Sequence, residues 1–478
     1  MSTDSLPSTE LRSFGDRLEE TEDEPVESGG DNTPGGATLV GVTHLHDAGL
    51  NRQHVTIDLL PDNVLLEVFD LYRLRDSRYA SPWPWRWHTL VHVCQRWRYI
   101  ILASPCRLDL RLLCTKKTPA KESLHIWPTL PIEINDGYSY LSNESEGCKN
   151  VHAALEHHDR VSGIKLTIEK SPLERWATVI QKPFPALMHL ELRSNASKEP
   201  LVLPDGFLGG FAPRLQTISL SCIAFPALPK LLSSSKDLVC LTLNNIPPSC
   251  YISPEAMVTG LSGLTNLESL TFRYPLLWSS PHQRSENPPP VTRVIIPALT
   301  EFKFTGDCGY LDDLVAQIDA PLLANFEIMF ADEPFLWIRH LPQFIDRTEE
   351  LGSPDFARLQ FCRRGGMEMT LQKSRGSLKL TIPRGQYCCE IRLMMQICEQ
   401  SLLTLSTVKT LRIRKERSAE MKHVDWVEFC RPFTAVENIH VCRALGPLVG
   451  ALGDLAYSRK EHEKHVLPAL KDVWEGRG

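Results

Sequence analysis

The stretch IDLLPDNVLLEVFD, residues 57–70, decides the first part of the fold together with LVHVCQRWRYII, residues 90–101. Apolar residues of the first piece recur at i, i+1, i+4 and i+5, which places them on one stripe of a helix: Val64, Leu65, Val68 and Phe69. Pro61 has a preset φ where this helix begins, and Asp62 places a negative charge in its first turn. The first piece therefore predicts an amphipathic helix.

The second piece has the same helical period. Its apolar residues recur at a spacing of about 3.6: Leu90, Val93, Cys94, Trp97, Ile100 and Ile101. Ser104-Pro105 ends the pattern. The two pieces predict a compact pair of apolar helices. A unit of about 45 residues with this much apolar surface is expected to complete its core on a partner, because so short a unit is near the lower size limit for independent stability.

LPDNVLLEVF and LVHVCQRW resemble the F-box, the short helical module that docks on the small adaptor subunit of cullin-RING ubiquitin ligases. RLDLRLLC, LHIWPTLPIEI, RPFTAVENIHV and VLPALKDVW resemble segments of the large F-box family of mushroom-forming fungi. This resemblance implies adaptor-facing or supporting roles for nine residues: Leu60, Pro61, Val64, Leu65, Val68, Leu90, Val93, Cys94 and Trp97. The insert YRLRDSRYASPWPWR, residues 72–86, departs from the family by its length and its Trp and Pro content.

The tryptophans of this region allow two interpretations, a small core or a sticky surface for the adaptor. We assign Trp97 to the core and leave both interpretations open for Trp83 and Trp85.

Beyond residue 150 the chain repeats the template apolar-x-x-apolar-x-apolar. The copies are Val161-Ile164-Leu166, Leu187-Leu190-Leu192, Leu215-Ile218-Leu220, Leu238-Leu241-Leu243, Leu267-Leu270-Phe272, Leu299-Phe302-Phe304, Leu323-Phe326-Ile328, Phe356-Leu359-Phe361, Val408-Leu411-Ile413 and Val436-Ile439-Val441. Their first positions lie 23 to 33 residues apart, except for one interval of 52, in which SLKLTI (377–382) is interpreted as a degenerate copy. This period is close to that of leucine-rich repeats.

Each template predicts a short strand, and helices return the chain between strands. Helices are expected at 253–264, where Ser253 can cap and Pro254 sits at the first position, and at 311–318 and 391–405. Strands are expected to begin in two alternating runs before the repeats, at Leu108, Leu110 and Leu112 and at Leu130, Ile132 and Ile134. The fold class is therefore α/β: a small helical F-box followed by an irregular leucine-rich-repeat-like solenoid with a curved parallel sheet and outer helices.

This pattern divides the chain into four parts. They are a disordered acidic tail at 1–53, the F-box helical module at 54–105, connecting strands and first solenoid turns at 106–150, and the solenoid at 151–478. The tail is rich in Ser, Thr, Gly, Pro and acidic residues, so it cannot bury enough apolar surface to offset its ordering entropy.

Composition argues against several function classes. A net charge of −6 gives no general case for binding nucleic acid or an anionic membrane. The basic clusters Lys116-Lys117 and Arg412, Arg414, Lys415, Arg417 are interpreted as solvated faces. No secretory signal or membrane span is visible, and the 14 scattered cysteines are interpreted as reduced thiols. A cytoplasmic or nuclear location is expected.

Catalytic signatures are absent from the sequence. It has no phosphate-binding loop, dinucleotide fingerprint, nucleophile elbow or CxxC pair. Core cysteines and helix-surface histidines explain the nearest constellations: Cys388-Cys389 with Cys398, and His152, His157 and His158 with Glu156. Asp307-Cys308-Gly309 lacks an activating base. We therefore expect no enzymatic activity, catalytic residue, metal or cofactor.

Two functional hypotheses follow. The resemblance implies a substrate-recognition subunit of an SCF-type cullin-RING ligase in ubiquitin-dependent degradation, whose F-box docks on the adaptor, and through it the cullin, while the solenoid binds an unknown protein substrate. The alternative is a repeat scaffold that binds a partner outside any ligase.

Overall fold

The computed structural model describes residues 57–74, 86–115, 120–126, 130–136, 146–195, 200–247, 250–275, 292–330, 338–362, 366–383, 394, 405–415, 423–442 and 467–476. The chain divides into two units, Met1–Leu60 and Pro61–Gly478. In the first unit the described residues form one turn of 3-10 helix, η1 (Ile57–Leu59). The predicted tail at 1–53, the helix expected at 391–405 except for residues 394 and 405, and Trp83 and Trp85 lie outside the described residues.

Three helices begin the second unit: α1 (Asp62–Leu74), α2 (Arg86–Val91) and α3 (Gln95–Ala103). We call them the helical module. The first helix begins after Pro61, as predicted. The prediction of one continuous second helix was wrong. Leu90 lies in α2, which ends at Val91, and α3 begins only at Gln95. Cys94 separates them because its backbone is extended and its Sγ accepts a hydrogen bond from the Trp97 N–H at 3.4 Å, which caps α3.

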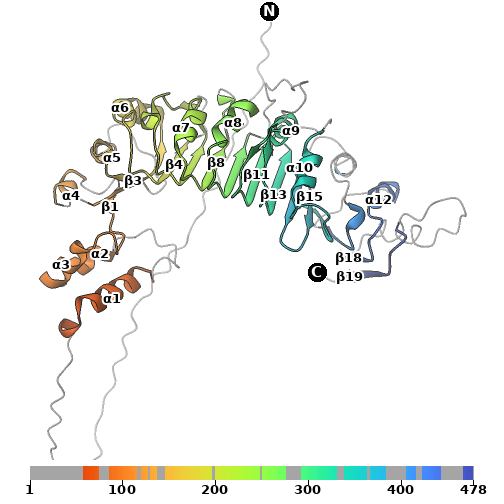
Figure 1. Cartoon of the computed structure of the whole chain (residues 1–478), viewed down its shortest axis with the longest axis horizontal. Helices are drawn as coiled ribbons and strands as arrows, with labels where there is room; N and C mark the ends of the chain where they lie inside the picture. Colours follow the sequence, from red (N-terminus) through yellow and green to blue (C-terminus); the bar gives the residue numbers. More distant parts are fainter. Residues whose placement is uncertain are drawn as a thin grey trace, which may run out of the picture. The chain divides into compact units, whose positions relative to one another are not determined.

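A sheet of 15 strands makes up the rest of the described fold (Figure 1). In spatial order the strands are β1 (Leu112–Cys114), β2 (Ile132–Asn135), β3 (Val161–Ile168), β4 (His189–Ser194), β6 (Thr217–Ser221), β8 (Cys240–Asn244), β9 (Ser269–Arg273), β11 (Glu301–Gly306), β13 (Asn325–Phe330), β16 (Ser377–Ile382), β15 (Met367–Gln372), β14 (Phe356–Phe361), β17 (Thr410–Lys415), β18 (Asn438–Cys442) and β19 (Asp472–Gly476). Two small parallel pairs accompany it: β5 (Leu201–Val202) with β7 (Ile223–Ala224), and β10 (Val294–Ile295) with β12 (Ile318–Asp319).

Helices and short 3-10 turns connect the strands. They are α4 (Ala120–Ile126), α5 (Glu146–Glu156), α6 (Lys170–Ile180), η2 (Phe207–Gly210), α7 (Leu228–Ser234), α8 (Pro254–Leu261), α9 (Cys308–Ala316), α10 (Leu341–Arg347), η4 (Leu405–Thr407) and α12 (His423–Cys430). Helices α5 to α9 lie along one face of the sheet in Figure 1. The helix expected at 253–264 is confirmed, and Ser253 caps it through a hydrogen bond from the Ala256 N–H at 3.3 Å.

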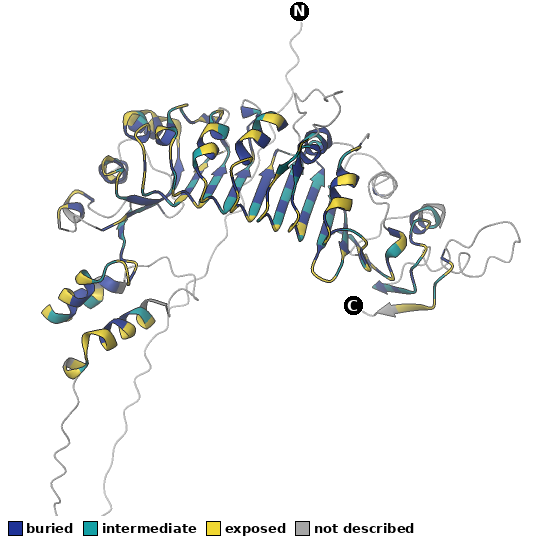
Figure 2. Cartoon of the chain, in the orientation of Figure 1, coloured by how far each residue is buried: buried dark blue, intermediate teal, exposed yellow. Residues whose placement is uncertain are grey.

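The predicted template positions stack in register across neighbouring strands. One row of parallel partners comprises Ile164, Leu190, Ile218, Leu241, Leu270, Phe302 and Phe326. All of these side chains are buried, and the rings of Phe302 and Phe326 stack with centroids 5.1 Å apart. Buried and partly exposed residues alternate along these strands in Figure 2. The repeat pattern therefore fixes both the strands and the core between sheet and helices.

The predicted start of the first strand was wrong. Residues 105–109 form turns, so the first strand starts at Leu112 and the buried Leu108 precedes it. The predicted parallel sheet is confirmed for most of the described strand pairs, and the exception is β15, which is antiparallel to both β14 and β16. This meander reverses the order of the copies: the SLKLTI segment, β16, pairs with β13, and β14 pairs with β17. Within β14 the template is displaced by two residues, since Ala357, not Leu359, is the partner of Leu411.

Candidate protein-interaction surfaces

Helix α1 carries apolar residues on two faces. Leu65 and Phe69 are buried at 0% and 1% exposure, whereas Val64 and Val68 are 38% and 40% exposed. The single stripe predicted for these four residues is therefore two adjacent stripes, one in the core and one at the surface. The surface stripe continues to Leu71, which is 66% exposed.

We call Val64, Val68, Leu71 and Tyr72 the α1 stripe. These residues lie at i, i+4, i+7 and i+8, so one side of the helix presents them together. The sequence prediction missed Leu71 and Tyr72, although the same spacing rule extended by one turn would have found them. Exposed apolar side chains arranged in this way are typical of an interaction surface.

The second half of the module supplies the core partner of α1. Trp97 is buried, as predicted, and its ring lies 4.8 Å from that of Phe69, centroid to centroid. Leu90 is half-buried. Val93 and Tyr99 are exposed at 58% and 73%.

The nine residues predicted to serve adaptor binding thus have different environments. Leu65 and Trp97 belong to the core, and Cys94 caps α3. Val64, Val68 and Val93 are exposed. Pro61 is exposed, and Leu60, which belongs to the first unit, is half-buried.

Ion pairs link α1 to the residues that follow it. Arg96 on α3 pairs with Asp62 at 2.6 Å, and Arg107 pairs with Glu67. All four side chains are substantially exposed, so each pair contributes on the order of 0.2–1 kcal/mol. Burial of Phe69 and Trp97 therefore contributes more to the stability of the module than these ion pairs do.

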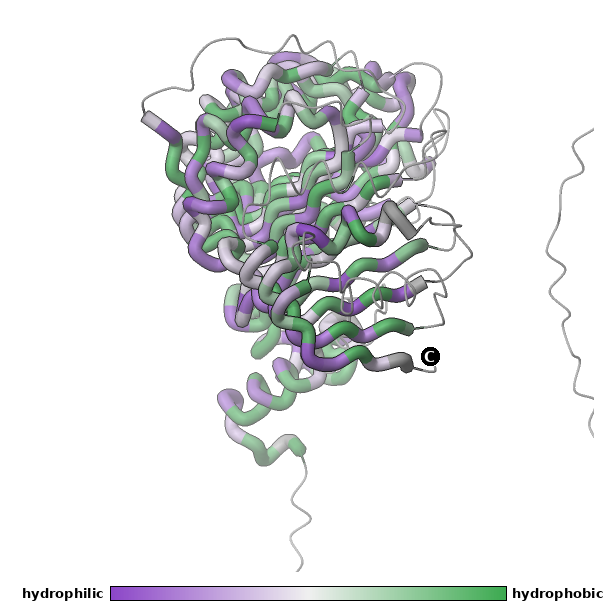
Figure 3. Tube along the Cα trace, turned by 90° about the vertical axis from the view of Figure 1, so that its right-hand side faces the viewer, coloured by the Kyte–Doolittle hydropathy of each residue, from purple (hydrophilic) through white to green (hydrophobic). Residues whose placement is uncertain are grey.

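The second candidate surface is the polar face of the 15-stranded sheet. Hydrophilic and hydrophobic residues alternate along the strands near the C-terminus in Figure 3. Its charges are mostly paired across strands: Lys165 with Glu191 at 2.8 Å, and Lys379 with Glu327 at 3.3 Å. On β11, a hydrogen bond from Lys303 lowers the pKa of Glu301, and Ser269 adds a second hydrogen bond.

His, Cys, Asp and Glu side chains are the groups that could form a metal or catalytic site. Within the described ranges, no group of three or more His, Cys, Asp or Glu side chains is placed to hold a metal ion. His152 pairs with Glu156 at 3.6 Å, and His158 Nδ1 lies 2.8 Å from the Pro183 carbonyl oxygen. Asp307 is the N-cap of α9 and accepts a hydrogen bond from the Tyr310 N–H, which explains Asp307-Cys308-Gly309 as a helix start with a buried thiol. Cys388, Cys389 and Cys398 lie outside the described residues.

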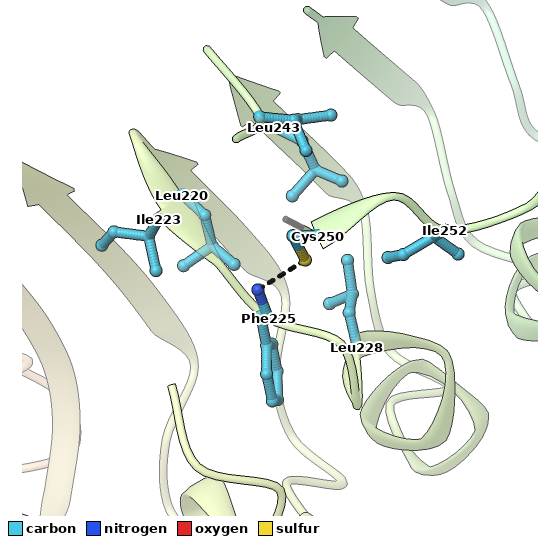
Figure 4. Close-up of a pocket in the computed structure, with 8 residues that line it drawn as sticks. Leu220, Ile223, Phe225, Leu228, Leu243, Cys250 and Ile252 are labelled. Carbon is cyan, nitrogen blue, oxygen red and sulfur yellow. Dashed lines mark hydrogen bonds between the residues drawn. The ribbon is translucent and has the colours of Figure 1, made fainter. Parts of the chain in front are cut away.

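A small apolar cavity between repeats is shown in Figure 4. Its volume is about 10 Å³, which is room for one water molecule at most. In its wall the Phe225 N–H donates a hydrogen bond of 2.8 Å to Cys250 Sγ, and burial raises the pKa of this thiol. The cavity is too small for a substrate or cofactor. Among the described helices, none is both long and apolar enough to cross a membrane.

The strand order and register define the class of protein: a leucine-rich-repeat-like α/β solenoid, here preceded by a three-helix module. A solved structure similar to the chain is the leucine-rich repeat-containing protein LegL7 from Legionella pneumophila, with 9% identity, a TM-score of 0.29, and coverage of 77% of this chain and 90% of that one. No protein-family model and no curated protein matches the chain.

Proposed function

We propose that this chain is the substrate-recognition subunit of a cullin-RING ubiquitin ligase. In this role the helical module is an F-box that binds the adaptor, and the solenoid binds the target protein. The chain itself would perform no chemistry and need no cofactor. It would act in the cytoplasm or nucleus by raising the concentration of the target near the charged conjugating enzyme.

One observation carries the proposal: the α1 stripe is exposed on a module whose sequence resembles the F-box. Among the described residues of the second unit, six exposed large apolar residues lie between Asp62 and Ala103: Val64, Val68, Leu71, Tyr72, Val93 and Tyr99. Six others are distributed over the much longer described part of the solenoid: Val202, Phe211, Ile295, Leu322, Val473 and Trp474. Covering a large apolar side chain contributes about 1.5–3 kcal/mol, so the stripe favours a protein partner.

The experiment is recovery of the adaptor and cullin with the tagged full chain from cells. Leu65→Asp is unsuitable, because Leu65 is fully buried and an unpaired charge there would unfold the module. Val64→Asp combined with Val68→Asp changes the surface instead. Val202→Asp is the matched control, since Val202 is 50% exposed and lies on the solenoid strand β5.

The proposal expects adaptor and cullin with the wild type and with Val202→Asp, and loss of both with the double variant. Recovery of neither protein by the wild type, or equal recovery by all three chains, would contradict it.

The alternative is an interaction scaffold outside any ligase. The polar face of the sheet supports the scaffold as well as the ligase subunit, because a protein could bind to this face without the adaptor. Target recovery without cullin would support the scaffold.

A further inference from the structure

The polar face of the sheet changes character at its C-terminal end. Register partners on β14, β17, β18 and β19 form one row across four parallel neighbours: Arg358, Arg412, His440 and Trp474. Neighbouring strands are about 4.8 Å apart, and partners in register lie on the same side of a sheet. We call these four residues the Arg–Trp row.

The row is open to solvent. Arg358 and Arg412 are exposed, Trp474 is 58% exposed and His440 is half-buried. The strand residues between them, such as Leu359 and Ile413, are buried toward the helices, which assigns the row to the polar face.

The register that contains the Arg–Trp row continues across the sheet toward β1, and the charges there are paired. There Lys165 pairs with Glu191, and Lys379 pairs with both Glu327 and Glu368. Arg358 and Arg412, in contrast, are adjacent cations and form no ion pair or hydrogen bond with the described part of the chain. Like charges directly opposite each other on neighbouring strands are destabilising. This arrangement suits a surface whose counter-charge arrives with a ligand.

Other charges near the row do not change this balance. Glu368, beyond Gln360 on β15, is held by Lys379 at 3.0 Å, and Glu437 is held by Lys471 at 2.8 Å. Asp472 is exposed and begins β19, two residues before Trp474 on the same face. Arg414 lies on the same face, two residues beyond Arg412.

We propose that the Arg–Trp row binds an extended, carboxylate-rich peptide segment of a target protein. Arginine holds a carboxylate through two parallel hydrogen bonds, and Arg and Trp are the residues most enriched at binding hot spots. The four strands span about 14 Å, which an extended chain covers in four or five residues. Two arginines and one histidine, with Arg414 beside them, are fewer than the roughly 6–10 phosphate contacts of a protein whose DNA binding depends steeply on salt.

This inference rests on the proposed function only in calling the bound protein a target for ubiquitin transfer. In the sequence, Arg412 is recognisable only as a member of a local basic cluster. Arg358 lies 54 residues earlier, so its position beside Arg412 follows only from the strand order.

The test measures binding of fluorescein-labelled deca-glutamate to the purified full chain by fluorescence anisotropy, without adaptor. The variants are Arg358→Gln, Arg412→Gln and their combination. Arg273→Gln is the matched control, because Arg273 is an exposed arginine of the same face on β9. Decauridylate is the nucleic-acid probe.

We expect each arginine variant to weaken deca-glutamate binding about tenfold, the double variant more, and Arg273→Gln by less than twofold. Arg412→Gln should leave the unfolding midpoint unchanged or raise it, since it removes a like-charge neighbour. Absent binding, unchanged binding in the double variant, or tighter binding of decauridylate would overturn the inference. Because the assay contains no adaptor, failure of adaptor binding cannot produce any of these results.

Discussion

The ring of Trp97 on α3 packs against the ring of Phe69 on α1, with centroids 4.8 Å apart and an interplanar angle of 59°. This contact joins two segments that residues 75–85 separate in sequence. An aromatic pair of this kind stabilises the fold beyond the effect of the surface area that each ring buries. The pair is therefore the centre of the module that presents the α1 stripe.

Replacing this ring should destabilise the module. We expect Trp97→Ala to lower its free energy of unfolding by about 3–5 kcal/mol, because the substitution leaves a cavity beside Phe69. Tyr99→Ala is the control: Tyr99 is 73% exposed on the same helix, and its loss should cost less than about 0.5 kcal/mol. Hydrogen exchange of the α1–α3 amides measures both. Equal protection in the two variants would argue against this core.

Asp312 on α9 is a buried carboxylate that caps α10. Its oxygens accept hydrogen bonds from the backbone N–H groups of Arg339, His340 and Leu341 at 3.1, 2.8 and 2.9 Å. Asp312→Ala leaves these groups without their acceptor, so we expect a loss of about 2–4 kcal/mol. Asp346→Ala, at an exposed position of α10 itself, should change stability by less than about 0.5 kcal/mol. Chemical denaturation of both variants checks this, and similar midpoints would refute the capping role.

Two buried thiols should give the solenoid a pH dependence. Burial raises the pKa of Cys430 to about 12 and that of Cys114 to about 12, with Arg160 partly opposing the latter. An unfolded thiol ionises near pH 8.5, so above that pH the unfolded state loses protons that the folded state keeps. Stability is therefore full below about pH 8.5 and falls as pH rises. Each thiol should remove about 2 kcal/mol by pH 10.

Comparison of the wild type with Cys430→Ala tests this: the variant should lose less stability between pH 8 and pH 10. Peptide mapping after iodoacetamide treatment at pH 8 gives a second readout. The exposed Cys106 should be labelled in the native chain, and Cys114 and Cys430 only after unfolding. Rapid native labelling of Cys430 would contradict its burial.

The sequence predicted the repeating core well, because each copy obeys a local rule. Leu190, Ile218 and Leu241 stack in register as the template requires. The meander at β14–β16 was not predictable in the same way, since alternating burial is identical in parallel and antiparallel strands. In β14 the inward position beside Leu411 is held by Ala357, which the template had passed over for Leu359.

The candidate surfaces were predictable only in part. Spacing alone put Val64, Leu65, Val68 and Phe69 on one stripe, and it could not say where the core boundary falls within it. That boundary depends on packing against Trp97, which comes from a distant segment. The Arg–Trp row could not be predicted from spacing, because Arg358 becomes the register partner of Arg412 only through the order of the strands.

If the proposed function is correct, the α1 stripe binds the adaptor subunit of a cullin-RING ligase. Calorimetric titration of the purified full chain with the purified adaptor tests it most directly. We expect saturable binding with one adaptor per chain, at least tenfold weaker for Val68→Asp and unchanged for Val202→Asp. No heat of binding with the wild type, or equal affinity of the wild type and Val68→Asp, would contradict it.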